Sequence, residues 1–464
     1  MKILKNITVF TMVMLLSVST VLEAREKNIS NFSSSASNLV DSTGTFDGNK
    51  IYADVANNGL FLDYHVSGDS ALEWPKGTGV HSIFQSALWM GATVNGSIRT
   101  IVGDYTQDMG PGPWGGDPLA AVHRIYKVEK SMLASPLDFA DFQEWPVEFG
   151  APWVDVDGDG VYTPLPGGTD HPEFLGDQVL WFVSNDGDPA YKLNFGTSPM
   201  NVEIQTTMFG FDRPDVFGDM VFLKQLVINK GSDDLVDTYM GLWSDPDLGY
   251  AGDDFVGCDV ALGMGYVWND GDDSQYSTLD IGTPAAGYDF FQGPMVPCED
   301  GDSEEVCPTE GAKMFGTRHP GMKNLKMSSF AFYINGDATY TDPSDETEGY
   351  FYLQGLRKDG SAYPAEIAGD LYDQRFCFYG DPNDSAGHST ANPVDGNYAA
   401  SADRRFLMSV GPFTMAAGDS QEVVFGIFHA AGGDALSSVA YLKEVDALAQ
   451  TAYDIDFALP DSPP

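Results

Sequence analysis

Turn-forming residues recur along almost the whole chain and keep its apolar runs short. From about Ile51 onward, these runs alternate with clusters of Gly, Pro, Asn and Asp, and the 464 residues include 51 Gly and 27 Pro. Such residues interrupt helices, whereas short strands bounded by turns accommodate them. Hydrophobic residues make up 43% of the chain, which is enough for a large core and argues against disorder. The pattern predicts a mostly β protein, with one or more β-sandwich domains and long Gly/Asp-rich loops.

The strongest strand signals are apolar and β-branched runs with turn residues at their ends. They predict strands at residues 178–183, 202–209, 221–228, 405–410 and 421–428. The second and third flank a turn rich in Gly, Asp and Pro, which predicts a hairpin. The last two flank the turn at Gly418 and Asp419, and we expect them to pair within one sandwich.

One segment near the C-terminus has the periodicity of a helix instead. Its apolar residues recur at spacings of three or four, at Val439, Leu442, Val445, Leu448, Ala452 and Ile455. Asp434 or Ser437 can cap its first turn. We therefore expect a C-terminal amphipathic helix that packs its apolar stripe on a sheet.

The N-terminus has the features of an export signal. Lys2 and Lys5 precede an apolar run from Ile7 to Leu22, and Ala24 is a suitable last residue before cleavage. The run is short for a membrane span, although a retained anchor helix is the alternative. No second run of this kind follows, so we expect no integral membrane segment after signal removal.

Changes in composition suggest five successive ranges. They are a signal peptide at 1–24, a Ser/Asn-rich flexible lead-in at 25–50, an N-terminal β region with an acidic calcium-type loop at 51–230, a C-terminal β-sandwich region ending in the helix at 231–459, and a linker-like tail at 460–464.

The chain is strongly acidic, with a formal net charge of −44. Binding to nucleic acid or to anionic lipid depends on neutralising phosphates with Lys and Arg, so this charge excludes both as expected partners. It suits a protein that stays soluble outside the cytoplasm, or one that binds cations. We expect a secreted or cell-surface location.

Four cysteines in an exported chain favour disulfides. Cys298 and Cys307 bracket an acidic segment and form the expected local pair, whose short loop would contribute about 2–3 kcal/mol. That pairing leaves Cys258 with Cys377. Free thiols and zinc are the alternatives, but no CxxC or close Cys/His spacing supports zinc.

The sharpest chemical signal is an alternating acidic loop. Asp155, Asp157 and Asp159 are interleaved with Gly, so their carboxylates can converge on one point, and the Val161 carbonyl can add a main-chain oxygen. Calcium binds six to eight such oxygens. The loop is not a full EF-hand, because Pro166 occupies the twelfth position, where that motif has Glu.

A completing carboxylate for this loop could come from Asp170, Glu173 or Asp177. His171 is the one histidine close to it, and such a histidine is more often a plain hydrogen-bonded residue. The alternative to a calcium site is a solvated, metal-free Gly/Asp hairpin.

A second acidic cluster lies between residues 245 and 259. Asp245, Asp247, Asp253 and Asp254 are interleaved with Gly, and they would repel one another unless they are spread in water or gathered on a cation. We weigh a second calcium site equally against solvated charge.

Motifs for nucleophilic, zinc, phosphate-loop or dinucleotide chemistry are absent from the sequence. Five tryptophans lie in its N-terminal third, at Trp74, Trp89, Trp114, Trp145 and Trp153. Exposed aromatic rings bind sugars, and Trp114, in a Gly/Pro-rich segment, is the best candidate for exposure and glycan binding. Core packing is the expected use of most of the others.

Several segments together resemble a known group of proteins. They are residues 74–84 with 87–91, 155–162, 243–249, 287–294, and 403–413 with 418–420. They are similar to large uncharacterised secreted surface proteins of Bacteroidetes and related marine bacteria, over most of residues 50–459. Those proteins often continue into fibronectin type III-like repeats and a type IX secretion sorting domain, neither of which is found in these 464 residues. The resemblance implies location and architecture but names no reaction.

Two functions are therefore weighed. The first is a non-catalytic secreted or cell-surface protein with calcium-stabilised β domains, for adhesion, envelope structure or glycan binding. The alternative is a secreted polysaccharide hydrolase, which needs two carboxylates facing each other across a cleft, roughly 5–10 Å apart.

Overall fold

The structure is a computed structural model that describes residues 43–165, 170–314, 316–369, 373–384 and 400–460. The predicted signal peptide at 1–24 and residues 461–464 of the predicted tail lie outside the described residues. Every described element belongs to one compact unit, Asp41–Pro464. This unit is mostly antiparallel β, which confirms the predicted fold class.

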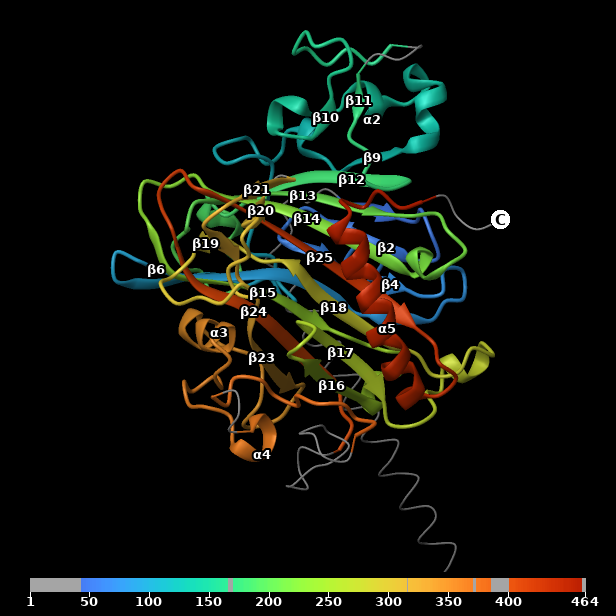
Figure 1. The fold of residues 1–464 in the computed structure, drawn as a ribbon, viewed down its shortest axis with the longest axis vertical. Helices are drawn as coiled ribbons and strands as arrows, with labels where there is room; N and C mark the ends of the chain where they lie inside the picture. The colour runs from blue at the N-terminus through green and yellow to red at the C-terminus, as the bar shows by residue number, and fades with distance from the viewer. Residues whose placement is uncertain (1–42, 166–169, 315, 370–372, 385–399, 461–464) are drawn as a thin grey trace, which may run out of the picture. The chain divides into compact units, whose positions relative to one another are not determined.

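Two large antiparallel sheets form the body of the unit (Figure 1). The nine-stranded sheet contains, in spatial order, β16 (Asp254–Asp259), β17 (Met264–Asn269), β18 (Ala285–Gln292), β25 (Ser420–Ala430), β14 (Met220–Asn229), β13 (Val202–Gly210), β12 (Gln178–Asn185) and β8 (Gly110–Pro111), with β9 (Tyr126–Glu129) also paired to β12. The six-stranded sheet contains β23 (Met327–Ile334), β24 (Arg404–Met415), β15 (Leu235–Asp245), β6 (Gln85–Val94) and β3 (Leu60–Leu62), with β7 (Ser97–Ile101) paired to β6.

The remaining strands are short. A four-stranded sheet contains β1 (Thr43–Phe46), β2 (Tyr52–Ala56), β4 (Leu72–Glu73) and β5 (His81–Ile83), and three two-stranded pairs are β10 (Trp153–Val154) with β11 (His171–Pro172), β19 (Met295–Pro297) with β22 (Met322–Asn324), and β20 (Ala312–Met314) with β21 (Thr317–His319). Within the described residues, the α-helices are α2 (Ala140–Gln143), α3 (Glu346–Leu353), α4 (Ala365–Ala368) and α5 (Ala435–Asp454). The 3-10 helices of the same ranges are Ala121–His123, Lys130–Ala134, Pro136–Asp138, Val147–Phe149, Pro189–Tyr191, Val216–Asp219, Ala251–Asp253 and Tyr276–Thr278.

The nine-stranded sheet is buried on both faces, and the sequence of β14 shows how. Val221 and Leu223 point into the core shared with the six-stranded sheet, whereas Met220 and Phe222 point into a second core that includes residues of α5. Side chains alternate between the two faces of a strand, so a strand with apolar residues at successive positions must be covered on both sides. The ring of Phe425, on β25, lies 5.3 Å from that of Phe61, on β3, across the shared core.

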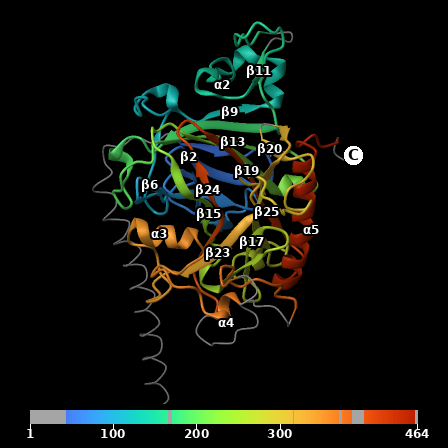
Figure 2. The same ribbon diagram turned by 60° about the vertical axis from the view of Figure 1, so that its left-hand side comes forward.

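The predicted C-terminal helix is present as α5 and covers the outer face of the nine-stranded sheet, where it contacts β17, β18 and β25. Figure 2 shows α5 and α3 on opposite sides of the two sheets. Asp434 provides the cap, because its Oδ1 accepts a hydrogen bond from the Ser437 main-chain N–H at 2.8 Å.

The predicted apolar stripe of α5 is wrong at two positions. Leu448 and Ile455 are exposed, and the helix buries Ala449 and Tyr453 instead. The buried face follows Leu442, Val445 and Ala449, which are spaced three and four residues apart. The small side chain of Ala449 fits close to the sheet. Hydrophobicity alone had favoured the larger Leu448 for this buried position.

Two further expectations need correction. The lead-in predicted to be flexible as far as residue 50 contains β1, and Phe46 is fully buried. The strands predicted at 405–410 and 421–428 exist as β24 and β25, but they do not pair with each other. β24 lies between β15 and β23, whereas β25 lies between β14 and β18. The turn at Gly418 therefore carries the chain from one sheet to the other. The hairpin predicted between β13 and β14 is confirmed.

The predicted boundary at residues 230 and 231 lies between β14 and β15, where the chain passes from the nine-stranded to the six-stranded sheet. Both sheets contain strands from both sides of this boundary. For example, β6 pairs with β15, and β14 pairs with β25. The ranges 51–230 and 231–459 thus share one core.

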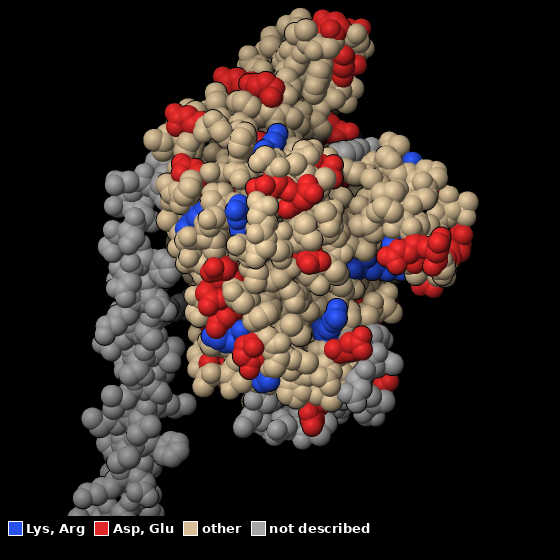
Figure 3. Space-filling view, turned by 90° about the vertical axis from the view of Figure 1, so that its left-hand side faces the viewer, with Lys and Arg blue, Asp and Glu red and all other residues tan. Residues whose placement is uncertain are grey.

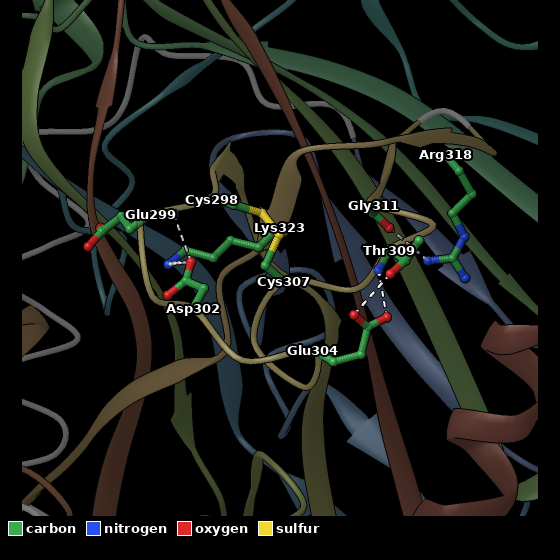
Figure 4. The surroundings of a disulfide bond; sticks show 9 residues. All are labelled: Cys298, Glu299, Asp302, Glu304, Cys307, Thr309, Gly311, Arg318 and Lys323. Carbon is green, nitrogen blue, oxygen red and sulfur yellow. Dashed lines mark hydrogen bonds and ion pairs between the residues drawn. A yellow bond between two sulfur atoms is a disulfide. The ribbon is translucent and has the colours of Figure 1, made fainter.

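The local disulfide between Cys298 and Cys307 is confirmed (Figure 4). Around it, Lys323 donates a hydrogen bond to Asp302 at 2.8 Å, and Glu304 accepts hydrogen bonds from the main-chain N–H and hydroxyl of Thr309. The Lys323–Asp302 ion pair and the disulfide together hold the acidic loop between the two cysteines against β22.

The predicted second disulfide is not formed. Cys258 and Cys377 are free thiols, both fully buried, and the Cys258 Sγ lies 3.5 Å from the main-chain oxygen of Cys377. Burial raises the pKa of each thiol well above the ordinary value for cysteine, and this disfavours the reactive thiolate. These cysteines therefore pack as small apolar residues.

Candidate functional site

The predicted acidic loop lies between β10 and β11, in a segment that projects beyond β12 at one edge of the nine-stranded sheet (Figure 1). β10 and β11 pair antiparallel, with Trp153 opposite Pro172 and Val154 opposite His171. This pairing brings the two ends of the loop together, so Asp155 and Asp170 become neighbours although fourteen positions separate them.

Four carboxylates converge in this loop. One oxygen from each of Asp155, Asp157, Asp159 and Asp170 lies within 4.8 Å of the others. Oxygens bound to one calcium ion at about 2.3–2.6 Å are separated by up to about 5 Å, so the spacing fits. Of the three completing carboxylates considered, the structure brings only Asp170 into the group.

The loop backbone is folded around these carboxylates. Asp155 accepts hydrogen bonds from the main-chain N–H groups of Gly158 and Gly160 at 2.7 and 2.9 Å. Both glycines have positive φ, at 76° and 75°, a conformation that other residues rarely adopt. Asp170 is buried and accepts from the N–H groups of Val156 and Thr163 at 2.9 and 2.7 Å. The carboxylates are thus held in place before any cation arrives.

Asp177 and His171 do not join the carboxylate group. The Asp177 carboxylate accepts a hydrogen bond from the Asp212 main-chain N–H. The Val161 carbonyl accepts one from the Thr163 hydroxyl at 3.3 Å, and its role as a ligand stays a prediction. His171 Nδ1 lies 2.8 Å from the Pro172 oxygen, so this histidine has the ordinary structural role expected for it.

The second acidic cluster divides into two parts. Asp253 and Asp254 both accept a hydrogen bond from the side-chain amide of Asn269, at 2.7 and 3.1 Å. Asp245 and Asp247 instead lie with Asp403, each contributing an oxygen within 4.8 Å of the others. Spacing along the sequence could not have indicated Asp403, because it is distant in the chain and is brought there by the pairing of β24 with β15.

Trp114 is the exposed tryptophan, as predicted, with 45% of its surface accessible. Its indole N–H donates to the Asn201 Oδ1 at 3.2 Å, and its main-chain N–H donates to Glu203 at 2.8 Å. The ring lies against Gly187, where a Cβ would come within 2.6 Å of it. Trp74, Trp89 and Trp145 are buried, as expected for core residues, and Trp153 is half-buried.

A pair of buried carboxyls lies beneath α5, and no spacing pattern in the sequence indicates it. Asp289 on β18 and Asp446 on α5 are 1% and 2% exposed and share a hydrogen bond, which requires a proton on one of them. Burial raises the pKa of both, to about 7 for Asp446. The charge of Asp446 raises the pKa of Asp289 further, whereas the hydrogen bond with Asp289 partly offsets the rise for Asp446. Nearby, Lys443 pairs with Asp259 and Asp381.

That pair does not have the geometry of a glycosidase site, because it lies under a helix and is closed to substrate. A cavity of about 500 Å³ lies elsewhere, between the segment that carries Phe174, the loop at Phe211 and the C-terminal residues around Phe457.

Among the described residues, no helix is long and apolar enough to cross a bilayer.

On the face shown in Figure 3, acidic side chains outnumber basic ones and lie in several separate clusters.

In comparisons with known proteins, neither a family model nor a curated sequence matches this chain.

Proposed function

We propose that the protein is an exported, non-catalytic β-sandwich protein of the cell surface or extracellular medium, stabilised by calcium in the Asp155–Asp170 loop. It would serve adhesion, envelope structure or glycan binding. The observation that carries the proposal is the convergence of four carboxylates within 4.8 Å of one another. The signal-like N-terminus and the net charge of −44 support export.

The donor set favours calcium over other metals. All four side-chain donors are carboxylate oxygens, which suit hard cations, whereas zinc and copper sites contain nitrogen or sulfur ligands. Asp155, Asp157 and Asp159 are exposed, so water can complete the coordination. The bound ion would offset the mutual repulsion of the four carboxylates and fix the loop on its hairpin.

A partner would bind beside this stabilised segment or at Trp114. The Trp114 ring offers an apolar face for a sugar, and the Asn201 amide and the Lys230 ammonium offer polar contacts, with Lys230 paired to Glu203 at 3.2 Å. A glycan is therefore the partner that this surface would suit.

The loop is tested by thermal unfolding of the purified protein in calcium and in chelator. A ligand present at a hundred times its Kd stabilises the folded state by about 2.7 kcal/mol, which corresponds to a rise of about 3 °C for a unit of this size. Asp157→Ala should abolish most of this rise while changing stability in chelator by less than about 0.5 kcal/mol.

The matched control for this experiment is Asp138→Ala, which removes an exposed aspartate outside the loop and should keep the full calcium effect. If millimolar calcium leaves the melting temperature of the wild-type protein unchanged, the calcium proposal fails. It also fails if Asp157→Ala responds as the wild type does.

A further inference from the structure

The ends of two neighbouring strands place three carboxylates beside one arginine. Asp245 is the last residue of β15, and Asp247 follows it by two positions. Asp403 immediately precedes β24, which pairs with β15 up to Ser244 and Phe406. Arg405 therefore lies next to Asp245, and it donates to the Asp245 Oδ2 at 3.0 Å and to the Asp403 Oδ1 at 2.7 Å.

Asp245 has an unsatisfied oxygen in this group. The residue is 1% exposed, and its Oδ2 accepts hydrogen bonds from Arg405 and from the Tyr105 hydroxyl, the latter at 2.8 Å. Its Oδ1 is buried and accepts no hydrogen bond within the described part of the chain. Leaving a buried carboxyl oxygen without a partner is costly, so Oδ1 is the atom available for a further ligand.

The charge of the group identifies the class of that ligand. When all three carboxyls are ionised, they and the one guanidinium leave two negative charges, which one divalent cation would neutralise. An oxygen from each of Asp245, Asp247 and Asp403 lies within 4.8 Å of the others, the spacing expected around calcium. A carboxylate has several acceptor sites, so Asp403 can bind a cation while it accepts from Arg405 and from the Asn335 amide.

We propose that Asp245, Asp247 and Asp403 bind a second divalent cation of the calcium class, which clamps the end of β15 to the start of β24. This site goes beyond the proposed function and does not depend on the Asp155–Asp170 loop. It differs from that loop in joining residues far apart in the chain, and in lying partly in the core.

The test measures calcium bound per chain by equilibrium dialysis followed by elemental analysis. The wild-type protein should bind about two ions, and Asp157→Ala and Asp247→Ala about one each. Asp247 is chosen because it is half-buried, whereas truncating Asp245 would leave Arg405 buried without its partner. Asp247→Asn, which nearly preserves side-chain volume, should lose the same ion.

A second measurement locates the ion. Terbium bound in place of calcium should be sensitised by Tyr105, whose hydroxyl donates a hydrogen bond to Asp245. In the Asp157→Ala protein, where the loop site is removed, adding Asp247→Asn should abolish the terbium emission sensitised by Tyr105. If Asp247→Asn retains both ions, Arg405 alone is the counter-ion and the second site is overturned. If the wild-type protein binds only one ion and Asp157→Ala loses it, the second site is overturned and the loop site stands. If the wild-type protein binds only one ion and Asp247→Asn alone loses it, the loop site is overturned and the second site stands.

Discussion

Replacing Asp446 with asparagine should stabilise the protein at neutral pH and leave its stability near pH 4 almost unchanged. An aspartate in the unfolded chain ionises near pH 4, whereas burial beside Asp289 raises the pKa of Asp446 in the folded state to about 7. Between these values the folded state retains a proton that the unfolded state loses. Stability contributed by the protonated pair is therefore full at acid pH and decreases as pH rises towards 7.

The expected size of this effect follows from the shift of about three pKa units. Each unit corresponds to about 1.4 kcal/mol, so the loss between pH 4 and pH 7 is at most about 4 kcal/mol. Asparagine cannot ionise, and its amide can donate to Asp289, so Asp446→Asn should gain roughly 2–4 kcal/mol over the wild type at pH 8.

Denaturant unfolding of wild-type and Asp446→Asn proteins from pH 4 to pH 8 measures this difference directly. Asp454→Asn is the matched control, because Asp454 is an exposed aspartate on the same helix. It should change stability by less than about 0.5 kcal/mol at every pH. A constant difference between Asp446→Asn and the wild type across this range would contradict the shared-proton interpretation.

Lys192→Met should destabilise the protein by about 3–5 kcal/mol, because it leaves two buried carboxylates without their cation. The Lys192 ammonium donates to Asp108 and to the Thr100 carbonyl oxygen, both at 2.7 Å, and lies 3.8 Å from Asp186. All three charged side chains are at most 2% exposed. Burial raises the pKa of both aspartates, and Lys192 opposes that rise.

Lys127→Met is the control for this prediction, since Lys127 forms a partly exposed ion pair with Asp47. Exposed pairs contribute less than about 1 kcal/mol. Adding Asp108→Asn and Asp186→Asn to Lys192→Met should recover much of the lost stability, because the uncompensated charges are then absent. Urea unfolding measures all of these changes, and a cost below 1 kcal/mol for Lys192→Met would show that the buried ions do not depend on one another.

Local patterns predicted local structure well. The β13–β14 hairpin, the Asp434 cap and the Cys298–Cys307 disulfide each depend on residues close in the sequence, and each is confirmed. The convergence of Asp155, Asp157 and Asp159 was also predictable, because the alternation of Asp with Gly determines the path of the loop. Whether calcium occupies the loop stays a prediction.

Arrangements that depend on distant residues could not be predicted in this way. A turn at Gly418 is equally compatible with a hairpin and with a crossing between sheets, and only the packing of β24 against β15 decides between them. Asp403 and the Asp289–Asp446 pair were missed for the same reason. Their partners are brought close by strand pairing and helix packing, which leave no spacing pattern in the sequence.

The position of β25 has a consequence for how the chain matures. This strand, at Ser420–Ala430, lies between β14 and β18 and joins the two halves of the nine-stranded sheet. During synthesis from the N-terminus, β14 and β18 have both emerged long before the strand that must be inserted between them. Until then, each presents an open edge that can pair with other chains. The sheet can therefore close only after residue 430 has been made, and until then these two open edges are exposed to aggregation.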